Sequence, residues 1–197
     1  MTGSTAGYAA EADRLAIQYE SITFEDVHRD ILHLIPAVPC AALDIGAGTG
    51  RDAAALARRG FTVTAAEPTA ELRRHGERLQ AGLPIRWLDD GLPDLPHLTA
   101  AGDRFGLILL TAVWMHLDTV EREHAMQAVA PLVARHGRMA MMLRHGPVPP
   151  GRRMFEVAAA EVITQASACG LRLLHHVERD DVFGRGDVTW DVLVLER

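Results

Sequence analysis

Short apolar runs alternate along this chain with segments whose apolar positions recur every three to four residues. Runs of the first kind predict strands, and the recurring pattern predicts helices. The predicted strands are 41–45, 61–66, 85–88, 105–110, 138–143, 171–177 and 190–195. The predicted helices are 11–19, 24–34, 52–59, 125–133 and 158–169. Pro131 should kink or shorten the helix over 125–133. This alternation is typical of an α/β fold with a mostly parallel sheet.

The first predicted strand runs directly into a glycine loop, Gly46-Ala47-Gly48-Thr49-Gly50, that precedes a helix. Glycines let the backbone turn sharply and bring a ligand close to its N–H groups. Asp44 beside the loop would repel a dinucleotide pyrophosphate but attract an ammonium, a hydroxyl or a sulfonium-bearing ligand. The dinucleotide fingerprint GxGxxG also needs a glycine where Arg51 stands. The loop therefore favours a ligand with a cationic amino-acid end.

At Asp44, Gly46, Gly48 and Gly50 the chain resembles the class I (Rossmann-like) S-adenosylmethionine-dependent methyltransferases, whose first motif is (D/E)xGxGxG. The resemblance implies a single doubly wound, mostly parallel seven-stranded sheet flanked by helices, with an antiparallel hairpin made by the last two predicted strands. It implies one domain, in which an N-terminal helical segment (1–38) closes over the cofactor and 39–197 form the core. The cofactor is then S-adenosyl-L-methionine. The loop residues expected to bind it are Asp44, Gly46, Ala47, Gly48, Gly50 and Arg51.

Glu67 ends the second predicted strand, about 20 residues beyond the loop, where α/β nucleotide folds place an acid that binds ribose. A carboxylate suits two vicinal hydroxyls, and Pro68 follows it in the expected site. An acid at a helix start is the ordinary alternative, because Pro68 and Thr69 also suit a helix N-terminus.

Two acids, Asp89 and Asp90, follow the third predicted strand and precede Gly91 and Leu92. In the resembled family, an acid here accepts a hydrogen bond from the adenine amino group, and the next residue's backbone lies under the ring. The pattern leaves open which acid does so, with Asp89 preferred, and a turn-forming Asp-Asp-Gly is the alternative.

The fourth predicted strand is a continuous apolar run, as in a strand buried on both faces, and it leads into Thr111, Ala112 and Val113. In the resemblance these three line the cofactor site. His116 lies just beyond them and is the candidate general base, because histidine titrates near neutral pH. The alternative for His116 is a packing histidine. Trp114 either forms a wall of the acceptor site or fills the core.

The N-terminal segment contains both tyrosines, Tyr8 and Tyr19, either of which could reach the cofactor's carboxylate. Tyr19 is the preferred candidate. A loop rich in proline and glycine follows the fifth predicted strand, at the carboxyl end of the sheet where open α/β sheets bind ligands. Its basic residues present either a cationic lid to an anionic acceptor or an ordinary solvated surface. These residues are Arg144, His145, Arg152 and Arg153.

Composition narrows the class of partner. The chain has 20 basic and 26 acidic residues, a formal charge of −6, and its arginines are scattered, so nucleic-acid binding is not expected. The (N/D/S)PP(Y/F/W) tetrad of amino-methylating nucleic-acid enzymes is also missing at 111–114. No apolar stretch reaches a membrane span and no signal peptide is evident, which predicts a cytoplasmic protein without membrane contact. Cys40 and Cys169 indicate no disulfide, and the histidines show no metal-ligand spacing.

Three hypotheses follow for the function. The first is an enzyme that transfers a methyl group from S-adenosylmethionine to an O, N or C atom of a small-molecule acceptor, as a monomer or homodimer. The second is a catalytically idle S-adenosylmethionine-binding regulator or subunit. The third, a nucleotide-cofactor oxidoreductase, is opposed by Asp44, by the displaced third glycine and by the absence of a second catalytic domain.

Overall fold

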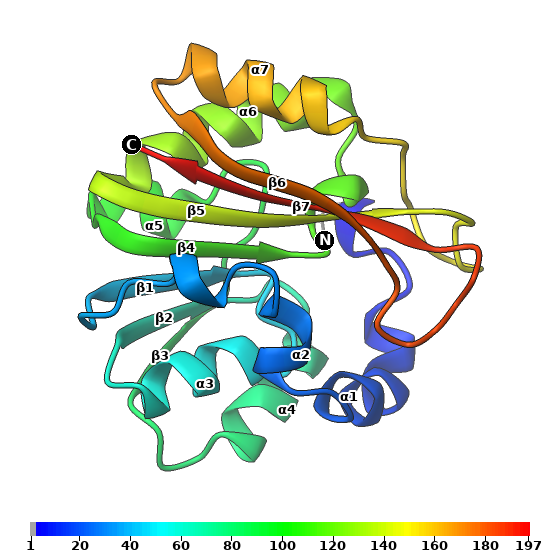
Figure 1. Cartoon of the computed structure of the whole chain (residues 1–197). Helices are drawn as coiled ribbons and strands as arrows, with labels where there is room; N and C mark the ends of the chain where they lie inside the picture. The colour runs from blue at the N-terminus through cyan, green and yellow to red at the C-terminus, as the bar shows by residue number, and fades with distance from the viewer. Residues whose placement is uncertain (1–2) are drawn as a thin grey trace.

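The computed structural model describes residues 3–197, which form one seven-stranded sheet with helices on both faces (Figure 1). The strands are β1 (Ala41–Ile45), β2 (Thr62–Ala66), β3 (Ile85–Leu88), β4 (Phe105–Thr111), β5 (Val133–His145), β6 (Arg172–Asp180) and β7 (Thr189–Glu196). The helices are α1 (Ala12–Glu20), α2 (Phe24–His28), α3 (Arg51–Arg58), α4 (Ala70–Leu79), α5 (Pro96–Ala101), α6 (Thr119–Val129) and α7 (Ala159–Ala168). Short 3-10 turns lie at Gly3–Thr5, Ala9–Glu11, Leu32–Leu34, Trp114–His116 and Ala130–Leu132.

The strand order is β3-β2-β1-β4-β5-β7-β6. All neighbouring pairs from β3 to β5 are parallel, and β7 is antiparallel to both β5 and β6. The predicted doubly wound sheet and its terminal hairpin are therefore confirmed. The order reverses between β1 and β4, and a crevice at such a point is where open α/β sheets bind ligands.

Alternate residues of the strands supply two cores because successive side chains point to opposite faces of a sheet. Leu43 and Leu193 face the layer of α5, α6 and α7, whereas Ala42 and Val192 face α2 and α3. Figure 1 shows these two helical layers above and below the sheet, with α1 beside the carboxyl ends of the strands. No helix in residues 3–197 is long and apolar enough to cross a membrane.

The structure adds α4 and α5, which were not predicted, begins α6 at Thr119, and changes the bounds of two other segments. The helix predicted over 24–34 ends at His28, and a 3-10 turn follows, because Ile31 closes a three-residue hydrogen bond to the His28 carbonyl and packs in the core. The fifth strand is longer than 138–143. It begins at Val133 and takes up the Arg135-His136-Gly137 segment as an irregularity, where His136 has a φ of 59° and the register with β4 shifts. Asp118 and Glu121 form a capping box at the start of α6, and the helix gives way to a 3-10 turn that contains Pro131.

Candidate cofactor and acceptor site

A cavity of about 530 Å³ opens at the carboxyl ends of the strands, under the N-terminal segment. Most of the residues expected at the site line it. They are Asp44, Gly46, Ala47, Gly48, Arg51, Glu67, Pro68, Gly91, Leu92, Thr111, Ala112, Val113, His116 and Tyr19. Gly50, Asp89 and Asp90 are not part of its wall. The volume is that of a site for one cofactor with a small acceptor.

The glycine loop turns between β1 and α3 with a left-handed backbone at Gly46, Gly48 and Gly50, whose φ values are 71°, 58° and 79°. A Cβ on Gly46 would lie 2.6 Å from a methyl carbon of Val113, so the loop and the end of β4 approach as closely as glycine permits. Gly50 closes the loop as the residue before α3. Gly50 therefore shapes the loop without reaching the cavity.

Glu67 is buried at the end of β2 and holds the glycine loop in place. Its carboxylate accepts hydrogen bonds from the N–H of Gly48 at 2.8 Å and the N–H of Thr69 at 2.7 Å. Burial raises the pKa of Glu67, and these two N–H donors oppose the rise. A carboxylate has about four acceptor sites, so acceptor capacity remains for ribose hydroxyls beside these two hydrogen bonds.

Beneath the loop, Asp44 and Asp52 form a buried pair of carboxyl groups. Asp44 accepts from the N–H of Ala53 at 3.2 Å. Asp52 is held by Nε2 of His28 at 2.9 Å and Nε of Arg51 at 2.7 Å. Burial, and then the negative charge of Asp52, raise the pKa of Asp44 well above its usual range. Burial alone would also raise the pKa of Asp52, but the charges of His28 and Arg51 lower it instead.

This arrangement leaves Asp44 beside the cavity without a cation of its own, which suits a ligand that carries one. His28 and Asp52 were missed in the sequence. Asp52 stands in the first turn of a predicted helix, where an acid is ordinary, and nothing in the sequence connects His28 with it. Thr111 completes the network, because its hydroxyl donates to Asp52 at 3.0 Å.

The two acids after β3 have different roles. Asp90 is buried and accepts from the N–H of Leu98 at 2.9 Å, so it binds the first turn of α5. The side chain of Asp89 is 66% exposed and pairs with Nη2 of Arg73 at 2.9 Å. Neither carboxylate lines the cavity, whereas Gly91 and Leu92 do. The backbone of the segment therefore reaches the site more directly than its acids.

His116 lies in the 3-10 turn after β4, and its ring is held at both nitrogens. Nδ1 lies 2.7 Å from the carbonyl oxygen of Arg153, and Nε2 lies 2.8 Å from the hydroxyl of Tyr8. Because a carbonyl only accepts, Nδ1 carries the proton and Nε2 of the neutral ring accepts from Tyr8. Burial lowers the pKa of His116, and the charges of Arg152 and Arg144 lower it further. The neutral ring is therefore the form present at neutral pH.

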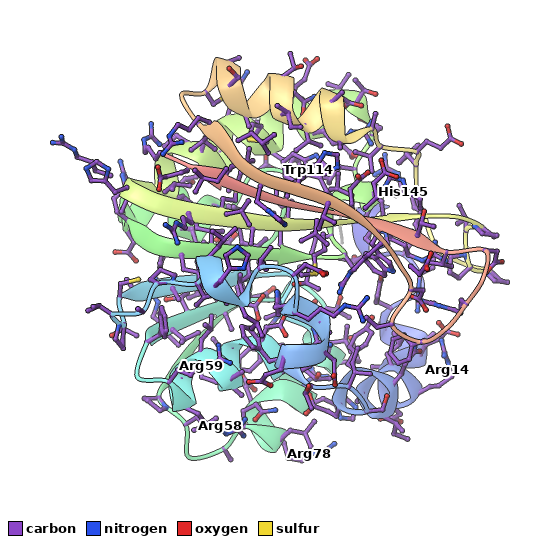
Figure 2. The ribbon with its side chains drawn as sticks, in the orientation of Figure 1. Arg14, Arg58, Arg59, Arg78, Trp114 and His145 are labelled. Atoms are coloured by element: carbon purple, nitrogen blue, oxygen red, sulfur yellow. The ribbon has the colours of Figure 1, made fainter. Side chains whose placement is uncertain are left out.

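Tyr8 was not the tyrosine preferred in the sequence, yet it lines the same cavity and completes this pair. Burial raises the pKa of both tyrosines, that of Tyr8 partly offset by the nearby Arg152. Tyr19 packs against the loop, since a Cβ on Gly48 would lie 3.4 Å from its ring. Trp114 is fully buried on the side of the sheet covered by α6 and α7, so it is a core residue and no part of the cavity wall (Figure 2).

The four basic residues at the end of β5 and in the loop after it take different positions. Arg144 and Arg152 line the cavity. Arg153 pairs with Asp118 at 3.0 Å and Glu121 at 2.6 Å and fixes the turn that contains His116. His145 points to the α7 side of the sheet (Figure 2), where Nε2 lies 2.8 Å from Asp191.

Asp191 also lies 2.5 Å from Nε2 of His176. His176, Glu178 and Asp191 form a cluster whose possible metal-ligand atoms all lie within 4.8 Å of one another. The sequence could not indicate this cluster, because β6 and β7 bring its members together only after folding. It lies outside the wall of the cofactor cavity.

Comparison with known proteins agrees with this geometry. Residues 42–137 match the model of a family described as "Methyltransferase domain". Uncharacterised methyltransferases of Mycobacterium tuberculosis and Mycobacterium bovis are each 32% identical over 121 residues, which cover 59% of this chain. The match spans 58% of those relatives, less than two thirds of their length.

Solved structures extend the likeness over the whole fold. Magnesium protoporphyrin IX methyltransferase from Synechocystis, with bound S-adenosylmethionine, covers 97% of this chain and 84% of its own, with a TM-score of 0.67 and 15% identity. A TehB-like S-adenosylmethionine-dependent methyltransferase from Corynebacterium glutamicum covers 94% and 97%, with a TM-score of 0.67 and 20% identity. A didemethyltoxoflavin N1-methyltransferase from Burkholderia thailandensis, with S-adenosylhomocysteine, covers 96% and 87%, with a TM-score of 0.64 and 18% identity. The strand order and these likenesses show the fold of the class I, Rossmann-like S-adenosylmethionine-dependent methyltransferases, and residues 42–137 are similar to a methyltransferase domain.

Proposed function

We propose that the protein transfers a methyl group from S-adenosylmethionine to an oxygen, nitrogen or carbon atom of a small-molecule acceptor. The observation that carries this proposal is that one cavity joins a cofactor-type loop to the Tyr8–His116 pair. A catalytically idle binding protein would need the loop but not a buried, paired base beside it. The same cavity therefore favours an enzyme over a regulator.

The residues of the cavity fit this cofactor. Asp44 offers a buried carboxyl to a cationic amino-acid end, and Glu67 offers lone pairs to the ribose hydroxyls. Gly46 allows the backbone to approach the ligand at a place that a Cβ would fill. Ala112 and Val113, with Leu92, supply apolar wall. When bound, S-adenosylmethionine supplies a methyl group already activated by its sulfonium.

The protein then has to hold the acceptor atom in line with that methyl group, exclude water and accept a proton where the acceptor has one to lose. We assign the proton transfer to Tyr8 and His116. The Tyr8 oxygen takes the proton of an acceptor O–H or N–H group while it passes its own proton to Nε2 of His116. Because burial raises the pKa of Tyr8, a free phenolate is disfavoured, and the two transfers are expected to be concerted. The carbonyl of Arg153 stabilises the resulting imidazolium through Nδ1.

Isothermal titration with S-adenosylmethionine, S-adenosylhomocysteine and NADH tests the cofactor first. Binding of the first two at micromolar concentration without NADH is expected. NADH binding alone would contradict the proposal. Transfer of labelled methyl groups to a panel of small molecules then separates an enzyme from an idle binder, because both would bind the cofactor and only the enzyme would turn over.

A further inference from the structure

The acceptor end of the cavity has more positive charge than the protein itself neutralises. Arg144 and Arg152 both line it, as do Tyr8 and His116. The guanidinium of Arg152 lies 4.0 Å above the ring of Tyr8. The charges of both arginines lower the pKa of His116, so both act on the same small volume.

Most arginines of this cavity already have an acid. Arg51 pairs with Asp52 at 2.7 Å, Arg179 with Asp30 at 3.2 Å, and Arg185 with Asp181 at 2.7 Å. Arg144 differs from them. Its Nη1 donates to the carbonyl of Pro147 at 3.0 Å, and no acid within residues 3–197 forms an ion pair with it. Burial and the neighbouring Arg185 lower the pKa of Arg144, and the charges of Asp181 and Asp187, which form no ion pair with it, oppose this fall only in part.

Arg152 is only partly satisfied. Its side chain is 6% exposed, and Nη2 pairs with Oε2 of Glu11, an oxygen that also accepts from Arg14 at 3.2 Å. One carboxylate thus serves two guanidinium groups. Nη1 of Arg152 is buried and has no hydrogen-bond partner among the described residues. A negative charge brought by a ligand is therefore favoured beside this buried, incompletely neutralised guanidinium.

The position of Arg144 indicates which ligand this is. The cofactor residues Asp44 and Glu67 end β1 and β2, whereas Arg144 lies in β5, on the far side of β4. The wall around Arg144 includes Phe183 and Trp190 of the β6–β7 hairpin. An anion at Arg144 therefore sits on the acceptor side, next to apolar side chains.

We infer that the methyl acceptor is a small organic anion, with a carboxylate that binds Arg144 in the field of the Arg152 charge and an apolar body that packs against Phe183 and Trp190. This inference rests on the proposed function, since it describes the second substrate of that reaction. It also explains why a chain of net charge −6 keeps an unpaired arginine in its main cavity.

The test uses the full chain saturated with S-adenosylhomocysteine in a low-chloride buffer, because salt screens such pairs. Acetate and benzoate are titrated calorimetrically beside their neutral counterparts, acetamide and benzamide. We expect at least one anion to bind at least about tenfold more tightly than its amide, and Arg144→Gln to remove that preference. Arg104→Gln is the matched control, because Arg104 also bonds only to main-chain carbonyls but lies just before β4, away from the cavity.

Each other result overturns the inference. Neither anion binding, or binding that Arg144→Gln leaves unchanged, would mean that Arg144 holds no carboxylate. A fall in S-adenosylhomocysteine affinity of about tenfold in Arg144→Gln would assign the site to the carboxylate of the cofactor instead. Failure of the wild type to bind S-adenosylhomocysteine is a separate result, which would contradict the proposed function itself.

Discussion

The hydroxyl of Tyr8 lies 2.8 Å from Nε2 of His116, although the two residues are 108 positions apart in the sequence. Their rings meet edge to face, with centroids 5.4 Å apart. The N-terminal segment therefore contributes a functional group to the cavity in addition to covering it. The base that we propose is complete only when this segment is in place.

Tyr8→Phe removes the hydroxyl and keeps the ring under Arg152. We expect methyl transfer to fall by about 100-fold, the lower part of the range for general acid–base catalysis. The affinity for S-adenosylhomocysteine should stay within about twofold, since Tyr8 bonds to His116 and not to the loop. Steady-state rates with labelled cofactor measure the first quantity and calorimetry the second. If the rate is unchanged, Tyr8 is a lid residue without a chemical role.

His116→Ala should also depress transfer while the cofactor affinity stays nearly intact. The pH profile separates a base from a packing residue. The pKa of His116 is lowered from 6.5. Above this lowered pKa the ring is neutral and active, and below it the ring is protonated and inactive. We therefore expect the wild-type rate to rise with pH along a limb below pH 6.5, and His116→Ala to lose that limb. A variant rate within about twofold of wild type would make His116 a packing residue.

The residues around the glycine loop could be placed together from the sequence because their signals are local. Asp44 lies near the end of a strand that its apolar pattern reveals, the glycines and Glu67 follow such strands, and parallel strands bring their carboxyl ends together. His28 and Tyr8 have no such signal. Each reaches its partner through the folding of the N-terminal segment over the sheet, a tertiary contact that no spacing in the sequence encodes. Asp90 shows the opposite case. Its position after β3 suggested a cofactor ligand, but its carboxylate accepts a hydrogen bond from the first turn of α5.

Asp44→Asn should stabilise the ligand-free protein and weaken cofactor binding. The folded pKa of Asp44 lies above its unfolded value, so ionisation favours the unfolded chain. The penalty is absent below the unfolded pKa of about 3.9 and grows as pH rises above it. Asparagine removes the penalty, and the gain in melting temperature should be larger at pH 7 than at pH 4. S-Adenosylmethionine affinity should fall at least about tenfold, or 1.4 kcal/mol, with the lost charge-assisted contact. Unchanged affinity would refute the role of Asp44.

Glu67→Gln tests the ribose assignment. An amide has one acceptor oxygen where the carboxylate has two, so it loses either the Gly48 or the Thr69 hydrogen bond and the negative charge. We expect S-adenosylhomocysteine to bind at least about tenfold more weakly. The 2′-deoxy analogue is the control ligand, because it lacks one of the two ribose hydroxyls that Glu67 would bind. Glu67→Gln should therefore weaken the binding of this analogue less than that of S-adenosylhomocysteine. Equal losses for both ligands would mean that Glu67 only supports the loop.

Gly76 of α4 leaves room for the Trp87 ring, which also lies against Gly50 of the glycine loop. Gly76→Ala should destabilise the fold, although alanine is favoured over glycine in a helix by about 1 kcal/mol. A Cβ at Gly76 would lie 2.2 Å from the Trp87 ring. The ring has no free space on the loop side, because it lies so close to Gly50 that a Cβ placed there would be 2.7 Å from it. Such overpacking costs about 1–3 kcal/mol, so urea unfolding should shift to lower concentration and cofactor affinity should fall as Gly50 is displaced. Gly186→Ala, with nothing within 4 Å of its Cβ, is the matched control and should change neither quantity. A Gly76→Ala protein as stable as wild type would show that Trp87 can repack without disturbing the glycine loop.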